Sequence, residues 1–586
     1  MTTATAHAPD QAHHEHHHEL GWWRTYVFST DHKVIGIQYG ITALVFLLVG
    51  FCLMMAMRWQ LAYPGESLGL LTAIFGSENV PGGVMVPEFY NQLGAMHGTI
   101  MIFLGVVPLG VGAFGNFVVP LQIGAPDMAF PKLNMASYWV YFVGGVVMIA
   151  SFFMPGGAAQ SGWTSYPPLT QAAPFWGQTM WLLGMVFLIT SSLLGSVNFI
   201  VTIVQLRAPG LTFFRMPFFV WAQLVTAFLL LLAFPPLEAA AVLQLMDRLA
   251  DTSFFLPSGL VFSGEPVEVS GGGSPLLWQH LFWFLAHPEV YVLILPGMGI
   301  VAEVIANNTR KPLWGYRSLV YSSLFLGFMS FVVWAHHMFM TGMGQNMSAF
   351  FAATTMIISI PSVVILTALL LSLWGASIRF NAPMLFALAF LPMFAIGGLT
   401  GLPLGLPAAD IYLHDTYYVI GHFHYVVAPG SLFALFAGVY FWFPKATGRK
   451  MNEFLGKLHF WPSFVFMNGI FLPMLFMGMA GVSRRLYDQT EYVQGELAQG
   501  WNVMMSWSAW LMGLTQIVFI INFFISIKWG EKVGANPWES TTLEWTAPSP
   551  PPHGNFPEIP QVYRDPYDYD PAKPGGYLAQ AQPQEN

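Results

Sequence analysis

Long apolar runs separated by short polar connections follow one another along most of the chain. An α-helix needs about 20 predominantly apolar residues to cross a bilayer. Runs of about this length lie near residues 34–58, 92–119, 137–154, 175–206, 216–243, 276–306, 315–340, 348–376, 383–404, 412–443, 456–480 and 502–528. The pattern therefore predicts an all-α polytopic membrane protein with about twelve transmembrane helices.

The Lys and Arg residues between these runs are unevenly distributed, which predicts the orientation of the chain. If both termini lie on one side of the membrane, the other side carries only Arg58, Arg248, Arg484 and Arg485, which leaves 17 of the 21 Lys and Arg residues on the side of the termini. Loops rich in Lys and Arg stay in the cytoplasm. We therefore predict an even number of spans and cytoplasmic termini.

Composition divides the chain into three regions. Residues 1–25 form a His-rich tail, residues 26–530 the helical core, and residues 531–586 a tail rich in Pro and Tyr. We expect both tails to be cytoplasmic and the second to be extended, lying on partners or on the core itself. The first apolar run begins near Val34, is longer than the apolar region of a signal peptide and lacks a small-residue cleavage site, so no secretory signal is predicted.

Composition also excludes a soluble protein and limits how the chain could bind a metal. Hydrophobic residues make up 55% of the 586 residues and charged residues 9%, against about 25% charged residues in a soluble domain. Cys52 is the only cysteine, which excludes disulfides within the chain and thiolate metal clusters. A bound metal must therefore be held by His, Asp, Glu or Met.

A polar cluster interrupts the apolar run 276–306. The stretch AHPEVY places His287, Glu289 and Tyr291 between PLLWQHLFWFL and VLILPGMGIVAEVIA. A charged residue near the bilayer centre costs about 2.5–3.5 kcal/mol on insertion scales, so we expect these side chains to serve a function. His287 and Tyr291 are four residues apart, which places them on one helix face with Cβ atoms about 5–6 Å apart.

Histidine carries the chemical prediction. Six of the 17 His residues fall inside predicted helices in a pattern with chemical meaning: His97, His287, His336, His337, His422 and His424. A single His in a membrane helix is more often a hydrogen-bonding partner of another helix than a ligand. Six of them, most without acidic partners, favour ligands instead, because imidazole binds copper and haem iron.

The spacing within two motifs separates the possible binding sites. In HFHY, His422 and His424 are two residues apart and hence about 200° apart around a helix axis. They cannot easily share one metal, but they could hold two centres on opposite flanks of the helix. His336 and His337 are adjacent, so sharing a metal would require a local distortion or different ring nitrogens.

Several motifs, in the same order, resemble subunit I of haem–copper terminal oxidases. They are HPEVY, WAHHM, the HDTYY…HFHYV run and FGNFVVPLQIGAPDMAFPKLN, and the resemblance covers residues 25–530. The branch that the chain resembles is the mitochondrial-type (A-type) cytochrome c oxidase. The resemblance implies a proton-pumping oxidoreductase of the bacterial inner membrane that reduces O2 to water.

The resemblance assigns the histidines to three centres. His97 and His424 would be the axial ligands of a low-spin haem a that receives electrons. His422 would be the proximal ligand of a high-spin haem a3 on the opposite flank of the same helix. Arg58 would form a hydrogen bond to the formyl group of haem a.

Copper B would face haem a3 across the site where O2 binds. The resemblance gives its ligands as His287, His336 and His337. Tyr291 would be the cross-linked tyrosine that supplies an electron and a proton for cleavage of the O–O bond.

Polar residues near the outer surface would complete the cofactor sites. Arg484 and Arg485 are implied to pair with haem propionates, although ordinary interfacial arginines would also fit these positions. His414 and Asp415 resemble a magnesium (or manganese) site, and Asp410 lies near the propionate region.

Proton transfer requires polar groups between the cytoplasm and the buried centre. The resemblance makes Asp127, in GAPDMAFP, the entrance of the D pathway and Glu289 its branching point; a buried, protonated hydrogen-bonding role for Glu289 is the structural alternative. Side chains that could line the water chain between them are Asn116, Asn134, Asn198, Ser191 and Ser192.

One departure from the resemblance concerns the second proton route. Relatives carry a lysine shortly after the proline of the eighth helix, but the run here is IPSVVI, with Ile365 at the aligned position. Ser362 retains the hydroxyl of this K pathway. We expect Ser359, Ser362 and Thr355 to organise a water chain without the lysine; the alternative is that the D pathway delivers every proton.

The predicted enzyme requires partners. Because the chain lacks paired cysteines, electrons from cytochrome c or a cytochrome-containing complex would arrive through a dicopper centre on subunit II, and subunit III is also expected. The substrate would be O2, and no nucleic-acid partner is predicted. The main alternative is a quinol oxidase. A nitric oxide reductase is disfavoured by the Tyr and Glu of HPEVY, and a secondary transporter by the six His residues.

Overall fold

The computed structural model describes residues 21–262, 264–267, 269–569 and 576–583, so residues 1–20 of the predicted His-rich tail lie outside the described residues. Twelve segments of the described chain are long and apolar enough to cross a membrane: α1 (His32–Ala62), α3 (Pro87–Thr99) through α4 (Phe114–Ile123), α5 (Pro131–Ala150), α6 (Phe175–Gln205), α7 (Phe218–Leu249), α8 (Pro275–Thr309), α9 (Tyr316–Ser330) with η8 (Trp334–Thr341), α10 (Gln345–Leu373), α11 (Ala382–Leu404), α13 (Tyr417–Val426) through α14 (Phe433–Thr447), α15 (Glu453–Met479) and α17 (Gln499–Trp529). The predicted all-α polytopic fold is confirmed, whereas the side on which the termini lie stays a prediction.

Short elements connect these spans. The short helices are α2 (Gly69–Asn79), α12 (Pro407–Leu413) and α16 (Val493–Leu497), and the single-turn segments are η1 (Trp23–Val27), η2 (Pro81–Gly83), η5 (Ser151–Phe153), η6 (Leu169–Gln171), η7 (Phe213–Arg215) and η10 (Leu543–Trp545). Within the described residues, four two-residue strands form two antiparallel pairs. β1 (Val261–Phe262) pairs with β2 (Glu265–Pro266), and β3 (Arg449–Lys450) pairs with β4 (Glu531–Lys532).

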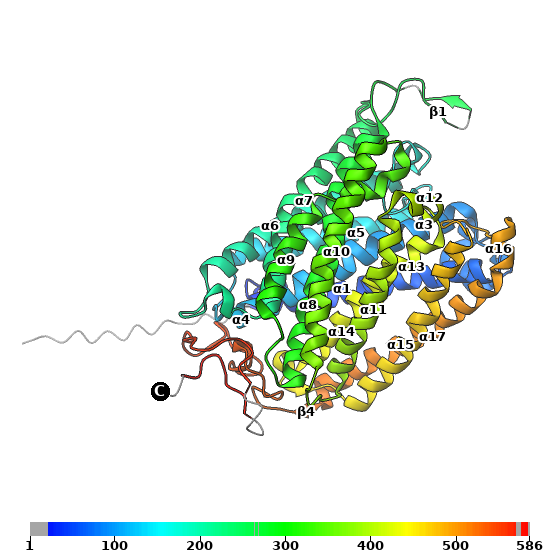
Figure 1. The fold of residues 1–586 in the computed structure, drawn as a ribbon. Coiled ribbons are helices and arrows are strands. Elements are labelled where there is room, and N and C mark those ends of the chain that lie inside the picture. Colours follow the sequence, from blue (N-terminus) through cyan, green and yellow to red (C-terminus); the bar gives the residue numbers. More distant parts are fainter. Residues whose placement is uncertain (1–20, 263, 268, 570–575, 584–586) are drawn as a thin grey trace, which may run out of the picture.

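The helices form one bundle with a well-defined centre (Figure 1). In the most apolar stretches, 94% of the residues in the α3-to-α4 span and 89% of those in α8 are buried, against 28% in α17. Helix α8 packs along α7 and also contacts α11, α14 and η8. The polar AHPEVY motif therefore lies in the middle of the protein, and α17 belongs to the periphery.

Irregular helical turns occur next to the predicted ligands. The α3-to-α4 span changes to π-helix in η3 (Ile100–Val106) and η4 (Pro108–Ala113), directly after His97. A further π-helical segment, η9 (Val427–Leu432), follows the HFHY motif. Such π-helical turns are frequently found at functional sites.

The C-terminal segment, residues 531–569, packs on one end of the bundle, opposite the end that carries β1 (Figure 1). Leu543 and Trp545 are buried, and Lys445 Nζ of α14 donates to the Ala547 carbonyl at 2.6 Å. Asn555 Nδ2 donates to the Ala125 carbonyl at 2.7 Å. The sequence predicted a tail that lies on partners or on the core. The described part of this tail lies on the core.

Candidate metal and proton sites

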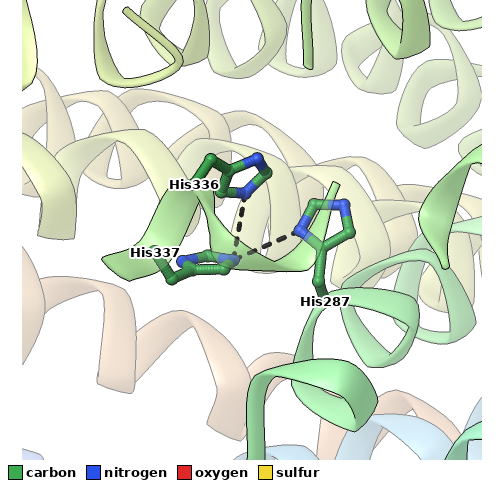
Figure 2. A group of neighbouring side chains, drawn as sticks. All are labelled: His287, His336 and His337. Atoms are coloured by element: carbon green, nitrogen blue, oxygen red, sulfur yellow. Dashed lines mark hydrogen bonds between the residues drawn. The ribbon is translucent and has the colours of Figure 1, made fainter. Parts of the chain in front are cut away.

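Three imidazole rings from distant parts of the chain meet inside the bundle (Figure 2). His287 comes from α8, and His336 and His337 come from η8. The Nε2 atom of His337 lies 3.1 Å from His336 Nε2 and 3.2 Å from His287 Nδ1. Within the described residues, this is the one group of three His, Cys, Asp or Glu side chains whose ligand atoms all lie within 4.8 Å of one another. An all-imidazole donor set suits copper.

The backbone of η8 brings two adjacent histidines toward one point. The segment is a tight 3-10 helix, and Met338, directly after the pair, leaves the helical region with φ −123° and ψ 17°. Two neighbouring side chains on a regular α-helix would diverge by about 100°. The local distortion expected for a shared ligand site is therefore present.

Neighbouring side chains hold the two rings of η8 in place. The His337 ring stacks on Trp283 with centroids 3.8 Å apart, and Trp283 Nε1 donates to the Tyr166 hydroxyl. His336 Nδ1 lies 2.8 Å from Thr355 Oγ1 on α10. The apolar pattern gave no indication of Trp283 as a support, because a Trp beside an apolar run is usual in a membrane helix.

Tyr291 lies on the His287 face of α8, as their four-residue spacing predicts. The two ring centroids are 4.9 Å apart. His287 directs Nδ1 toward His337, while its Nε2 is buried and has no hydrogen-bond partner among the described residues. The free Nε2 thus remains available to the phenol, and Nδ1 to a metal.

Three further histidines share one hydrogen-bonding arrangement. In each of them Nδ1 lies 2.8 Å from a backbone carbonyl: His97 with Gly50, His422 with Gly397 and His424 with Ile420. Since a carbonyl only accepts, Nδ1 carries the proton and Nε2 keeps its lone pair. The Nε2 atoms have no partner within the part of the chain that the structure describes. Metal-ligating histidines typically donate their other N–H in this way, so these residues fit axial haem ligation.

His422 and His424 belong to different neighbourhoods on α13. His424 interacts electrostatically with His97 and stacks on Phe471 with centroids 4.6 Å apart. His422 instead interacts electrostatically with His336 and His337. The helix therefore separates two sites, and the three-histidine cluster lies on the His422 flank.

Arg58 is buried near the C-terminal end of α1, and one nitrogen of its guanidinium has no partner among the described residues. Its Nε donates to Ser506 Oγ at 3.0 Å and its Nη2 to Asn502 Oδ1 at 3.2 Å. Nη1 is buried without a partner among the described residues. An unpaired buried donor is costly, so Arg58 fits a role in which Nη1 binds an acceptor such as a formyl oxygen.

The predicted outer polar residues lie together at one edge of the bundle. His414 Nδ1 is 3.2 Å from Asp410 Oδ2, and His414 Nε2 is 3.9 Å from Asp415 Oδ2. Arg484 donates to Asp415 Oδ1 from Nη2 at 2.6 Å. Burial opposes ionisation of Asp415, but Arg484 overcomes it and lowers the pKa of this carboxyl; burial lowers the pKa of Arg485 to about 10. The cluster has oxygen and nitrogen ligands for a cation, although Asp415 also pairs with Arg484.

Glu289 is buried beside the metal cluster, and neither carboxyl oxygen has a hydrogen-bond partner among the described residues. A cavity of about 40 Å³ lies between α1, α5, α6 and the π-helical turns η3 and η4, and neither Asp127 nor Glu289 is among its lining residues. Since a water needs roughly 10–15 Å³ of such space, the cavity has room for a short water file.

The lining of this cavity agrees only in part with the predicted polar residues. Asn116, Ser191 and Ser192 line it, together with Tyr39, Ser137 and Ser196, which the sequence did not single out. Asn134 and Asn198 do not line it. The Asn198 side chain is bound to the backbone of Phe130, whereas Asn134 Nδ2 is buried without a partner in the described chain.

Asp127 lies in the loop after α4, at the end of the bundle that the C-terminal segment covers. Burial raises the pKa of its carboxyl, with an opposing contribution from His32. His32 Nδ1 lies 2.6 Å from the carbonyl of Asn116, a residue of the cavity lining. Asp127 thus interacts electrostatically with a histidine that is hydrogen-bonded to the backbone of the cavity lining.

The predicted second route lies on α10. Ile365 is buried. Ser359 Oγ donates a hydrogen bond to the Met356 carbonyl at 2.6 Å. The Ser362 hydroxyl has no hydrogen-bond partner among the described residues. Thr355 Oγ1 lies 2.8 Å from His336 Nδ1 of the metal cluster, so one hydroxyl of α10 contacts this cluster directly.

Comparison with known proteins gives a consistent result. The model of a family described as cytochrome C and quinol oxidase polypeptide I matches residues 34–511. Cytochrome c oxidase subunit 1 of Synechocystis sp. is 45% identical over 94% of both chains, and that of Thermostichus vulcanus is 43% identical over 95% of this chain and 94% of the relative. The alternative cytochrome c oxidase subunit 1 of Bradyrhizobium diazoefficiens is 42% identical over 97% and 95% of the two chains.

A solved structure has the same fold. It is a haem–copper terminal oxidase dimer determined by electron cryomicroscopy, with a TM-score of 0.68 and 20% sequence identity. The similarity covers 85% of this chain and 84% of the solved chain.

Proposed function

The chain belongs to the cytochrome c and quinol oxidase polypeptide I family, and we propose from this a role for each of its polar sites. It is an integral membrane protein and the catalytic subunit of a terminal oxidase. We infer that it reduces O2 to water with electrons from cytochrome c and couples the reaction to proton pumping. The convergence of His287, His336 and His337 on the His422 flank of α13 is the observation that carries this proposal.

The histidines would hold two haems and one copper. His97 and His424 would ligate haem a, His422 would ligate haem a3, and the three-histidine cluster would hold copper B. The free Nε2 atoms of the haem ligands and the convergent nitrogens of the cluster support this arrangement. These groups, when bound, supply electron transfer and O2 binding, chemistry that the side chains of the protein cannot perform.

The side chains around the centre would supply protons and hold charge. Tyr291, on the His287 face, would provide an electron and a proton, and Glu289 would pass protons that enter at Asp127. Arg58 would bind the formyl group of haem a through its free Nη1. Arg484 and Arg485 would neutralise propionates; His414 and Asp415, with Asp410 adjacent, would bind magnesium or manganese.

The other members of the complex follow from what the chain lacks. A single cysteine, Cys52, cannot form a dicopper centre, so subunit II would carry it and subunit III would complete the complex. We place the complex in the bacterial inner membrane with both tails in the cytoplasm. The family model includes quinol oxidases, but the named relatives are cytochrome c oxidases. Turnover of the purified complex with reduced cytochrome c and not with quinol would identify it as a cytochrome c oxidase.

Optical spectra and metal analysis test the cofactor assignment. The purified complex should show a low-spin and a high-spin haem in the reduced-minus-oxidised spectrum. Copper should be present at one equivalent in this chain, in addition to that of the dicopper subunit. A single haem, or no copper beyond that of the partner, would contradict the proposed ligand sets.

The missing lysine makes the proton route testable. Electrons that reach a buried centre leave uncompensated charge in a medium of low dielectric constant, so protons must accompany them. We expect anaerobic reduction of the high-spin haem to stay fast in Asp127→Asn and to become slow in Ser362→Ala, because Tyr291 is reprotonated from the α10 side. Stopped-flow absorbance measures both rates.

The control for this experiment is Ser359→Ala. Its hydroxyl is already bound to the Met356 carbonyl, so we expect its loss to change the rate less than the loss of Ser362. Slow reduction in Asp127→Asn alone would mean that one pathway through Glu289 delivers every proton.

A further inference from the structure

The C-terminal segment inserts one side chain against the loop that carries Asp127. Asn555 is the one buried residue between positions 552 and 559, where Pro552 and His553 before it and residues 557–559 after it are exposed. Its backbone has a φ of 69°, in the left-handed region that Asn adopts more readily than most residues. The backbone turn therefore directs this one polar side chain inward.

Contacts on both sides fix the orientation of the Asn555 amide. Its Oδ1 accepts from Lys33 Nζ at 3.0 Å, and its Nδ2 donates to the Ala125 carbonyl at 2.7 Å. An ammonium group only donates and a carbonyl only accepts. The reversed amide would place nitrogen against nitrogen and oxygen against oxygen. The oxygen of Asn555 therefore faces the start of α1.

This orientation places His32 between two hydrogen-bond acceptors. Its Nδ1 lies 2.6 Å from the Asn116 carbonyl, and its Nε2 lies 2.9 Å from Asn555 Oδ1. A neutral imidazole has one nitrogen that donates and one that accepts. A neutral His32 would therefore direct a lone pair at one of the two oxygens, whereas a doubly protonated ring donates to both. The contacts thus select the positively charged form of His32.

The charged groups around His32 balance this charge. Lys33 Nζ pairs with Asp31 Oδ2 at 3.0 Å, and Asp31 Oδ2 also lies 3.2 Å from Nδ1 of the exposed His553. Asp127 interacts electrostatically with His32. Burial and Lys33 oppose a charge on His32, whereas Asp127 and Asp31 favour it. With His32 protonated, two cations face two carboxylates, so the group contains no buried charge without a counterion.

We propose that Asn555 is a positioning residue for proton uptake at Asp127: its Oδ1 holds His32 doubly protonated, and the charge of this ring favours the ionised form of the Asp127 carboxyl. An ionised carboxylate can take a proton from water, whereas a protonated carboxyl group must first release its own. The C-terminal segment thereby contributes to the entrance as well as covering it. The inference rests on the proposed role of Asp127 as the proton entrance.

An infrared titration of Asp127 tests this proposal. Asn555→Gly removes the amide and keeps the backbone, because glycine adopts a φ of 69° without strain. A hydrogen bond to a charged group is worth about ten- to a hundredfold in an equilibrium constant, so the charged form of His32 should be strongly depleted. We expect the proton affinity of Asp127 to rise by about tenfold. The carboxyl band that disappears in Asp127→Asn measures this affinity in the purified complex.

Proton uptake is the second readout of the same variant. A pH-indicator dye follows uptake from the aqueous phase during turnover. In Asn555→Gly uptake at neutral pH should slow by up to about tenfold, because a smaller fraction of Asp127 is ionised. Asn536→Gly is the matched control, since Asn536 belongs to the same segment but its amide is hydrogen-bonded to the backbone of Ser540. It should change neither the titration nor the uptake rate.

A double variant distinguishes positioning of His32 from a general loosening of the segment. His32→Gln removes the charge and should itself raise the proton affinity of Asp127. Because Asn555 acts through His32, adding Asn555→Gly to His32→Gln should change the titration no further. Additive shifts in the double variant, or an unshifted carboxyl band in Asn555→Gly, would overturn the proposal.

The remaining outcomes separate this inference from the proposed function. Unchanged proton uptake in Asp127→Asn would contradict the entrance role itself, and the infrared titration would still decide whether Asn555 and His32 control the Asp127 carboxyl. If Asn555→Gly fails to assemble, His32→Gln in the otherwise unaltered chain decides: a raised proton affinity of Asp127 supports the charged His32, and an unchanged one overturns it.

Discussion

Replacement of His424 by alanine should abolish the low-spin haem signal, whereas replacement of His422 should abolish ligand binding at the high-spin haem and leave the low-spin absorbance in place. Both residues lie on α13, but His424 interacts electrostatically with His97, and His422 with His336 of the three-histidine cluster. Each variant would therefore remove the proposed ligand of a different haem. We expect turnover to be lost almost completely in both, in His424→Ala because electrons cannot enter and in His422→Ala because O2 cannot bind.

Reduced-minus-oxidised spectra and carbon monoxide difference spectra of the two variants separate these outcomes. His459→Ala is a matched control, because His459 is also a buried imidazole in a membrane span but is hydrogen-bonded to Tyr440 and Gln516. It should retain both haems. Loss of the same single haem in His422→Ala and His424→Ala would contradict the opposite-flank arrangement.

The sequence was sufficient to predict the parts of the structure that depend on local periodicity. Twelve apolar runs became twelve spans because helix length and apolar content are set within each segment. The position of His287 and Tyr291 on one face, and the separation of His422 from His424, follow from helix geometry alone. The distortion at His336 and His337 is one of the two arrangements expected of adjacent ligands, the other being the use of different ring nitrogens.

Features that depend on contacts between distant segments were predicted less well. Tyr39 and Ser137 line the cavity through packing of α1 against α5, which no local pattern reveals. Asn198, expected along the water chain, instead binds the backbone of Phe130. The start of the second span was placed near residue 92 but lies at Pro87, because Glu88 and Asn91 made its first turn look too polar for a membrane helix.

Replacement of Tyr291 by phenylalanine should leave the haems and copper largely in place but nearly eliminate O2 reduction. Phenylalanine keeps the ring that packs 4.9 Å from His287, so the substitution removes only the hydroxyl group. A positioned proton donor contributes about 10²–10⁴-fold to a rate, and this hydroxyl would also supply an electron. We therefore expect O2 consumption by the purified complex to fall by about 10²-fold or more.

The interpretation of this variant requires that its metal content be measured together with its turnover. Tyr440→Phe is the matched control, because Tyr440 also lies in a span, with its hydroxyl group 3.2 Å from His459 Nδ1 and outside the proposed sites. It should keep most of its activity, since the loss of one hydrogen bond of this kind costs only about 0.5–1.5 kcal/mol of stability. If fully metallated Tyr291→Phe instead turned over at close to the rate of the unaltered enzyme, the phenol on the His287 face would have no part in the reaction, and its contact with the His287 ring would be packing alone.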